Sequence, residues 1–191
     1  MRVIGAAYNF KGLEHPSGEP IFFFKNHRPD YVHIDPMSKN NRLKLPSYAN
    51  SVWPEVEVAF HVGMDEENNP FILHYSVAND FTADFGPDCH YLLGKSFPGS
   101  FKISMVATSK APRADAKMYC RINEELIQED VVGNMIYNPQ KLLDFLHSTV
   151  GLEKRDIITC GTPFHTKTPL KSGDIVSVFI EGLGGITNYC D

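Results

Sequence analysis

Apolar and polar positions alternate with a period of two along several short stretches of the chain, a pattern typical of strands with one buried face. One stretch folds back on itself, because Met118, Cys120 and Ile122 alternate with other side chains before a turn at Asn123 and Glu124, which predicts a hairpin. Turn residues such as glycine, proline and aspartate separate these stretches. The predicted strands cover residues 20–25, 53–63, 71–78, 117–127, 157–160 and 175–181.

One stretch has the spacing of a helix. It begins at Asn138, a favourable N-cap that is followed by proline, and it ends at Gly151. Between them, three leucines and a valine form an apolar stripe. Many short strands, one clear helix and no alternation of strands with helices predict a mixed α/β fold dominated by strands.

Composition limits the classes of partner. We expect the 191 residues to form a single domain over 1–191, with residues 1–19 as a candidate mobile N-terminal lid. A net charge of −5 argues against nucleic acid and anionic membranes as main partners, since both need a basic surface. No apolar run approaches the roughly 18 residues of a membrane span, and the first residues do not form a secretory signal. The cytoplasm is therefore the expected location.

The four cysteines lie far apart in the sequence. Because no two of them form a CxxC pair, neither a zinc site nor a redox motif is indicated. We expect buried free thiols rather than disulfides at Cys89, Cys120, Cys160 and Cys190.

Two carboxylates lie one residue apart within the very apolar segment 53–63. On a strand, Glu55 and Glu57 share one face, with their backbones roughly 7 Å apart, so their side chains can converge on one point. Two buried anions repel each other unless a cation lies between them, and a hard divalent ion suits a cluster of carboxylates. The alternative is a solvated strand face with two unrelated glutamates.

Three further positions carry candidate chemistry. Asp80 ends the strand that follows the glutamates, and a strand returning beside the first can bring this aspartate close to Glu57 as a third oxygen ligand. A turn or helix cap is the alternative role for Asp80. Glu14 and His15 form an acid and base pair on the N-terminal loop, where a solvent-exposed pair is the alternative.

Six segments occur in the order of the motifs of one known family. They are EVEVA at 55–59 with Gly63, NDFTA at 79–83, GKSF at 94–97, NEELIQ at 123–128, ITCGTP at 158–163 and LKSGD at 170–174. On these segments, the chain resembles the fumarylacetoacetate hydrolase family over most of its length from residue 20 onward. The resemblance implies the mixed β-roll fold of that family and often a homodimer.

The resemblance also implies a chemistry. It assigns Mg²⁺ or Mn²⁺ to Glu55, Glu57 and Asp80, and it implies a small 2-oxo acid or β-dicarbonyl as substrate. Lys95 would face the substrate and add positive charge where negative charge develops. The remaining implied substrate contacts are Thr162 with Gly161 in the Gly-Thr-Pro loop, and Gln128.

Two departures from the family pattern affect the expected activity. The His and Glu of the family's N-terminal lid, which activate water, are absent at their usual positions, and Glu14 with His15 are the nearest substitutes. Asp84 stands where some members carry an arginine that binds the substrate carboxylate. If Asp84 faces the pocket, we expect it to disfavour a second carboxylate on the substrate.

The implied reaction passes through an enolate, which a metal ion stabilises as a Lewis acid. Hydrolysis of a C–C bond in an acylpyruvate is the expected reaction. Decarboxylation, dehydration or isomerisation of a 2-oxo acid at the same site are alternatives. A catalytically silent relative that binds a metal and a small acid is the alternative outside enzymes.

Overall fold

The computed structural model describes residues 1–25, 29–33, 35–86, 91–164 and 166–191. Strands predominate in this part of the chain, as predicted. The strands are β1 (Val3–Ala7), β2 (Ile21–Lys25), β3 (Asp30–Val32), β4 (Arg42–Leu43), β5 (Ser51–Trp53), β6 (Val56–Met64), β7 (Pro70–Asp80), β8 (Thr82–Asp84), β9 (Phe101–Ser104), β10 (Lys117–Ile122), β11 (Glu125–Val131), β12 (Ile157–Thr159), β13 (Ile175–Ile180) and β14 (Gly184–Cys190). The helices are α1 (Tyr91–Lys95), α2 (Pro139–Val150) and the short 3₁₀ helices η1 (Lys39–Asn41) and η2 (Val132–Asn134).

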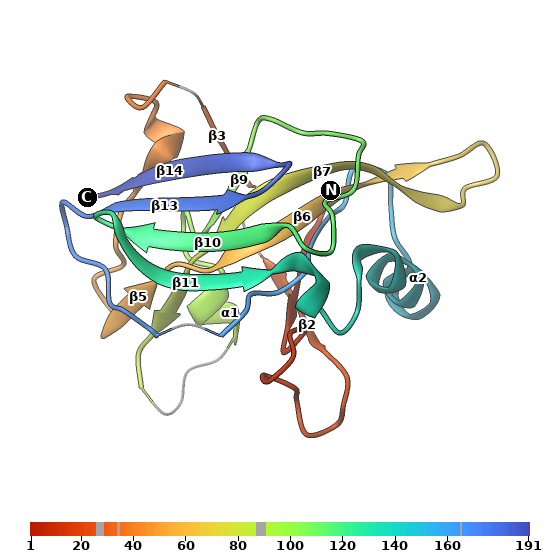
Figure 1. Ribbon diagram of the computed structural model, residues 1–191, viewed down its shortest axis with the longest axis horizontal. Helices are drawn as coiled ribbons and strands as arrows, with labels where there is room; N and C mark the ends of the chain where they lie inside the picture. Colours follow the sequence, from red (N-terminus) through yellow and green to blue (C-terminus); the bar gives the residue numbers. More distant parts are fainter. Residues whose placement is uncertain (26–28, 34, 87–90, 165) are drawn as a thin grey trace.

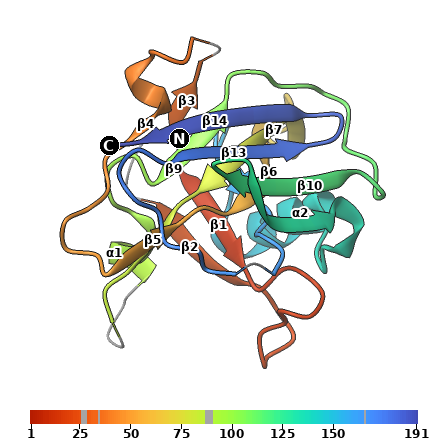
Figure 2. The ribbon, with the colours of Figure 1, turned by 60° about the vertical axis from the view of Figure 1, so that its left-hand side comes forward.

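The strands form two main sheets and a small ribbon. A seven-stranded sheet has the order β2-β1-β12-β6-β7-β9-β3, and a five-stranded sheet has the order β11-β10-β13-β14-β4. The ribbon pairs β5 with β8. Figure 1 shows the five-stranded sheet lying across the long β6–β7 hairpin, and Figure 2 shows the same layers from a second direction.

The main hydrophobic core lies between the two sheets. From β6 it receives Val56, Val58 and Phe60, which are all fully buried, and from the five-stranded sheet it receives Met118 and Val178. A second buried cluster lies on the other face of the large sheet and includes residues of β1, β7, β9 and β12. Because both faces of β6 are covered, its sequence is a nearly continuous apolar run, in which the buried glutamates are exceptions.

Helix α2 follows the sequence signals. The Asn138 side chain accepts a hydrogen bond from the Lys141 N–H at 2.9 Å, and Gly151 ends the helix with a φ of 66°. The three leucines of the stripe, Leu142, Leu143 and Leu146, are buried, whereas its valine, Val150, is exposed at the end of the helix. The predicted hairpin is also present, as β10 and β11 joined at residues 123–124.

Several strands lie where the sequence pattern predicted none, and β1 and β14 are the longest of them. β1 pairs with β2 and β12 inside the large sheet, so residues 3–7 are not part of a lid and only the following loop stays a candidate. Gly5 interrupts the alternation of apolar and polar positions that would have indicated this strand. Only glycine fits at this position, because a Cβ would lie 2.3 Å from an atom of the Phe23 ring. β14 begins at Gly184, beyond the last predicted strand, and it pairs with β13 and β4.

The cysteines agree with the prediction where they are described. Cys120, Cys160 and Cys190 are free and buried, whereas Cys89 lies outside the described residues. Burial raises the pKa of all three thiols. These thiols are therefore part of the packing rather than reactive groups.

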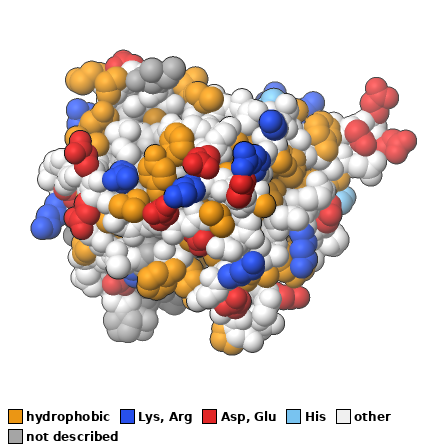
Figure 3. All heavy atoms as spheres, viewed as in Figure 1, with side chains coloured by type: hydrophobic (Ala, Val, Ile, Leu, Met, Phe, Trp, Pro, Cys, Tyr) orange, Lys and Arg blue, Asp and Glu red, His pale blue; other side chains and the backbone are white. Residues whose placement is uncertain are grey.

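The surface carries both signs of charge. On the face that Figure 3 shows, lysine and arginine are interspersed with aspartate and glutamate, and acidic side chains gather at the tip of the β6–β7 hairpin. This face therefore offers no continuous basic patch for nucleic acid. In the described part of the chain, no helix has the length and apolar character needed to cross a membrane.

Candidate metal centre

Three buried carboxylates meet where β6 begins and β7 ends. The two strands are antiparallel with Val56 opposite Asn79, so Asp80 lies beside Glu55, and the Asp80 N–H donates to the Glu55 carbonyl at 2.9 Å. One oxygen each of Glu55, Glu57 and Asp80 lies within 4.8 Å of the others. Exposures of 8%, 1% and 0% exclude the solvated strand face. The strand spacing thus brings the three predicted ligands together.

The β5–β8 ribbon orients Glu55. Pro54 has no N–H for a strand ladder, and Glu55 lies in the gap that separates β5 from β6. Trp53 and Thr82 are paired across the ribbon, and both donate to Oε1 of Glu55, the indole N–H at 3.1 Å and the hydroxyl at 2.9 Å. Two donors on one oxygen fix the direction in which the carboxylate points.

The loop after β12 orients Glu57. The Gly161 N–H donates to Oε2 of Glu57 at 2.8 Å. Gly161 has a φ of 82°, and a Cβ there would lie 2.9 Å from the Ala6 carbonyl oxygen, so glycine is required for this close approach. Gly161 was predicted to bind substrate; what the structure shows is that its N–H positions the Glu57 carboxylate.

Gln128 and Thr162 fasten this loop to the start of β6. The Gln128 amide oxygen accepts from the Val56 N–H at 3.2 Å, and its nitrogen donates to the Thr162 hydroxyl at 2.8 Å and to the Pro163 carbonyl at 2.7 Å. Thr162 donates in turn to the Val56 carbonyl at 3.0 Å. Both amide hydrogens of Gln128 are therefore used within the protein, and its predicted contact with substrate gains no support.

Two buried lysines neutralise part of the negative charge. Lys95, at the end of α1, forms ion pairs with Glu55 and, at 3.2 Å, with Asp80. Lys25, at the end of β2, forms an ion pair with the other oxygen of Asp80 and donates to the Ser100 carbonyl at 3.3 Å. Asp80 therefore lies between two ammonium groups.

Burial and charge act differently on these groups. Burial raises the pKa of Glu57 to about 8, with the Asp80 charge adding to the effect and the Lys95 charge opposing it. Burial alone would lower the pKa of Lys95, but Asp80, Glu55 and Glu57 together raise it. For Lys25 burial prevails, and its pKa lies below its ordinary value. Near neutral pH, Lys95 is thus a fixed cation while Glu57 holds a proton.

A cavity of about 350 Å³ opens onto this cluster. Four predicted site residues line it, namely Glu55, Glu57, Lys95 and Thr162. The rest of the wall comes from the N-terminal segment, the β5–β8 ribbon and the loop after Pro163: Ala6, Ala7, Tyr8, Leu13, Trp53, Thr82, Phe164 and Lys167. The cavity therefore combines a few charged side chains with aromatic and apolar walls, as small-molecule sites commonly do.

The sequence model of the family described as fumarylacetoacetate (FAA) hydrolase C-terminal matches residues 4–190. The chain belongs to the fumarylacetoacetate hydrolase family. Among curated relatives, the uncharacterized protein MJ1656 of Methanocaldococcus jannaschii is 33% identical over 152 residues, 75% of this chain and 64% of that protein. The mitochondrial oxaloacetate tautomerase fahd2 of Xenopus laevis is 28% identical over 189 residues, 89% of this chain and 57% of that protein. The chain thus spans less than two thirds of the length of either relative.

Solved structures share the fold. The 5-carboxymethyl-2-hydroxymuconate delta-isomerase of Mycobacterium smegmatis superposes with a TM-score of 0.82 at 23% identity, over 99% of this chain and 76% of that one. The fumarylpyruvate hydrolase of Pseudomonas aeruginosa, solved with Mn²⁺ and pyruvate, gives 0.75 at 19% identity, over 100% of this chain and 89% of that one. Named members of the fumarylacetoacetate hydrolase family are thus enzymes with several reaction types.

The lid pair lies outside the cavity wall of this family member. Glu14 is exposed and accepts from the Gly12 N–H at 3.0 Å. Hydrogen bonds from its own backbone N–H and from that of Gly12 hold the pKa of Glu14 below its ordinary value. The His15 ring is hydrogen-bonded to the Ser17 hydroxyl at 2.8 Å. Among the described residues, Tyr8 and Leu13 of this segment line the cavity, but Glu14 and His15 do not. The proposed water-activating pair therefore gains no support from this conformation.

The loop that carries Glu14 and His15 nevertheless begins at a residue, Asn9, whose side chain is held by three hydrogen bonds near the site. The buried Asn9 side chain donates to the Tyr137 and Cys160 carbonyls at 2.9 and 2.8 Å and accepts from the Tyr137 N–H at 2.8 Å. Tyr8, immediately before it, has a φ of 62°, which is uncommon for a tyrosine, and lines the cavity. The His15 ring packs edge-on against the Tyr8 ring, with centroids 5.3 Å apart.

Asp84 does not take the place of the family arginine at the substrate. Its carboxylate accepts from the Gly86 N–H at 3.1 Å, and its carbonyl accepts from the Asn50 N–H at 2.7 Å. It is absent from the described wall of the 350 Å³ cavity. The predicted repulsion of a second carboxylate by Asp84 is thus unsupported.

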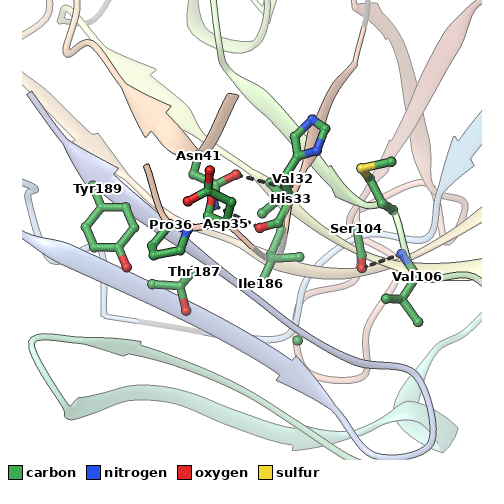
Figure 4. Close-up of a pocket in the computed structure, with 12 residues that line it drawn as sticks. Val32, His33, Asp35, Pro36, Asn41, Ser104, Val106, Ile186, Thr187 and Tyr189 are labelled. Carbon is green, nitrogen blue, oxygen red and sulfur yellow. Dashed lines mark hydrogen bonds between the residues drawn. The ribbon is translucent and has the colours of Figure 1, made fainter. Parts of the chain in front are cut away.

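A larger cavity, of about 880 Å³, lies between η1, β9 and β14 (Figure 4). Its polar groups serve the local structure, because the Asn41 side chain accepts from the His33 N–H at 2.9 Å and donates to the His33 and Asp35 carbonyls at 3.0 and 3.1 Å. The wall, as far as it is described, holds no cluster of carboxylates comparable to Glu55 and Glu57. The larger volume of this cavity therefore does not make it the better candidate for the functional site.

Pattern analysis missed three residues of the metal centre. Trp53 and Thr82 had no assigned role, although Trp53 opens the segment that contains the glutamates. Lys25 ended a predicted strand without an assigned chemistry. A lysine at the end of the aromatic run 22–24 was the available signal, because a lysine in so apolar a context needs a buried partner.

Proposed function

We propose that this member of the fumarylacetoacetate hydrolase family is a divalent-metal-dependent enzyme that stabilises the enolate of a small 2-oxo acid. The observation that carries this proposal is the group of three buried carboxylates, two of which, Glu55 and Glu57, line one cavity together with Lys95. Charged groups converging in a small, largely apolar cavity are typical of an active site.

The residues fit a hard divalent ion such as Mg²⁺ or Mn²⁺. Glu55, Glu57 and Asp80 offer only oxygen, and their oxygens lie close enough together for one ion to contact all three. When bound, the ion would act as a Lewis acid toward the oxygens of a 2-oxo carboxylate. The fumarylpyruvate hydrolase solved with Mn²⁺ and pyruvate supports this choice of ion and ligand.

Lys95 supplies the protein's own stabilisation of developing negative charge. Its ammonium is held by two carboxylates, and the Phe23 ring lies 5.3 Å from it, so its position is set before substrate arrives. Because the surrounding carboxylates raise its pKa, it stays charged throughout the neutral range. A cation fixed in this way lowers the free energy of an enolate without reorganisation.

Within this class we propose keto–enol or double-bond isomerisation rather than the C–C hydrolysis expected from the resemblance. Isomerisation moves a proton next to the keto group and needs no added water. This choice is supported by Glu14 and His15 lying away from the described cavity wall, and by the frog relative named an oxaloacetate tautomerase.

Hydrolysis of an acylpyruvate is the second candidate, and one observation favours it. His15 packs against Tyr8, which lines the cavity, so a movement of the loop that follows Asn9 would carry His15 toward the site. In that case Glu14→Gln and His15→Ala should abolish cleavage while leaving isomerisation unchanged.

The test measures both reactions on Mn²⁺-loaded protein, following the absorbance of the enol of oxaloacetate and of an acylpyruvate. Lys95→Met should lower kcat about a hundredfold, because it removes a preorganised charge. Lys171→Met, which changes an exposed lysine in the turn before β13, should leave kcat unchanged. No acceleration of either reaction by the loaded wild type, or full activity of Lys95→Met, would refute the proposal.

A further inference from the structure

We propose that Lys167, seated on the Trp53 indole, recognises a second carboxylate at the far end of the substrate. This inference rests on the proposed function and narrows it to short 2-oxo dicarboxylates. One end of such a molecule would meet the metal centre, and the other end would meet Lys167.

The Trp53 ring lies between Lys167 and the carboxylate cluster and contacts both. Its N–H donates to Glu55 at 3.1 Å, while the Lys167 ammonium lies 5.0 Å from the centre of the ring. Both side chains line the 350 Å³ cavity. Only the width of one indole therefore separates Lys167 from the carboxylate cluster, which suits a short carbon chain between two charged groups rather than a long acyl tail.

Lys167 differs from the other lysine of the cavity in what it contacts. Lys95 is buried and forms ion pairs with Glu55 and Asp80. Lys167 is exposed and has no carboxylate partner in the described part of the chain, so its contact with the Trp53 indole is what positions it at the cavity wall. An indole face attracts an ammonium group without neutralising its charge, which leaves that charge available to an anion.

The loop that carries Lys167 is restricted at both ends. Pro163 and Pro169 flank it, and proline fixes one backbone angle at each of these positions. The Pro163 carbonyl accepts from Gln128 at 2.7 Å, and Leu170 pairs its N–H with the Val52 carbonyl at 2.8 Å. These contacts tie the loop to the strands beside Trp53, so Lys167 stays near the cavity.

The sequence favoured the opposite selectivity. Asp84, in place of an arginine, predicted poor binding of a second carboxylate, but its side chain accepts from Gly86 away from the described cavity wall. Lys167 restores a positive charge from another part of the chain. The charges that line the cavity are then carboxylates and Lys95 at the metal end and Lys167 at the other.

The test uses the only tryptophan of the chain as the probe. Trp53 fluorescence of Mn²⁺-loaded protein is followed by stopped flow, within seconds of mixing with oxaloacetate or with 2-oxobutanoate. These two molecules share a four-carbon 2-oxo acid chain, but only the first has a second carboxylate. The variants are Lys167→Met, which keeps a long side chain without charge, Lys167→Arg, and Lys171→Met as the matched surface control.

We expect Lys167→Met to weaken oxaloacetate binding about five- to tenfold and to leave 2-oxobutanoate binding unchanged. Lys167→Arg should restore most of the loss, and Lys171→Met should bind both ligands like the wild type. An equal effect of Lys167→Met on both ligands, or no effect on either, would overturn the role of Lys167 while leaving the proposed function intact. If neither ligand bound the Mn²⁺-loaded wild type, both proposals would fail.

Discussion

Divalent-metal binding should become stronger as the pH rises from 6 to 8, because Glu57 must lose a proton to act as a ligand. Burial, together with the charge of Asp80, raises the pKa of Glu57 to about 8 from an ordinary value of 4.5. Below pH 8, the metal-free protein therefore keeps Glu57 protonated, and an incoming cation has to displace that proton.

The size of the effect follows from this pKa. Each pH unit well below 8 should change the apparent association constant about tenfold. Between pH 6 and pH 8 the total change should be about fiftyfold, or roughly 2.3 kcal/mol. At pH 7, binding of one ion should release roughly 0.9 proton.

Calorimetric titration with Mn²⁺ in two buffers of different ionisation enthalpy measures both the affinity and the released protons. Glu57→Gln should weaken binding and remove the pH dependence. Glu66→Gln, in the exposed turn between β6 and β7, should retain it. An affinity that is flat between pH 6 and 8 in the wild type would refute the reasoning.

The same titration has a consequence for folding. Because the folded-state pKa of Glu57 is raised, its contribution to stability is present below pH 4.5 and is lost as the pH rises through about 8. The metal-free protein should therefore lose stability relative to Glu57→Gln across this window. Thermal unfolding with a chelator and with Mn²⁺ measures the difference, and added Mn²⁺ should offset the loss.

Three further predictions concern the parts of the site. Glu55→Ala, Glu57→Ala and Asp80→Ala should each lower Mn²⁺ affinity tenfold or more by calorimetry, and unchanged binding in all three would exclude the site. Gly161→Ala should weaken Mn²⁺ binding because its Cβ would meet the Ala6 carbonyl, whereas Gly182→Ala, with the same φ of 82° and open space around it, should change stability alone. Asn9→Ala should cost about 1–3 kcal/mol in urea unfolding, since it leaves two carbonyls and an N–H near the site without their partner, and a smaller loss would show that water replaces it.

The elements that were predicted correctly are those whose sequence signals all lie within a few residues of one another. Helix α2 has an N-cap, a proline, an apolar stripe and a terminal glycine within 14 residues, and the β10–β11 hairpin has its turn between two alternating stretches. β1 and β14 were missed because glycines interrupt their patterns, and those glycines matter only through distant contacts. Gly5 makes room for the Phe23 ring, and Gly185 lies opposite Phe179 in the neighbouring strand.

The same distinction applies to the metal centre. Glu55 and Glu57 were found because a period of two places them on one side, and Asp80 was found because an antiparallel return brings a strand end back to a strand start. Lys25 and Lys167 follow no such local rule. Lys25 reaches Asp80 only because β2 and β1 lie in the same sheet as β7, and Lys167 reaches the cavity only because its loop packs beside Trp53.

The sum of the charges in the cavity explains what the lysines contribute to the site. When Lys25 and Lys95 both carry a proton, three ionised carboxylates leave one excess negative charge in a buried region, and a proton on Glu57 removes it. A divalent ion in place of that proton would leave the cluster with one positive charge, which favours an anionic ligand. A 2-oxo carboxylate brings one negative charge to the metal end, and a second carboxylate would exceed the balance there unless another cation received it. Lys167, on the far side of the Trp53 ring, is the described cation in the cavity that carboxylates of the protein do not already neutralise.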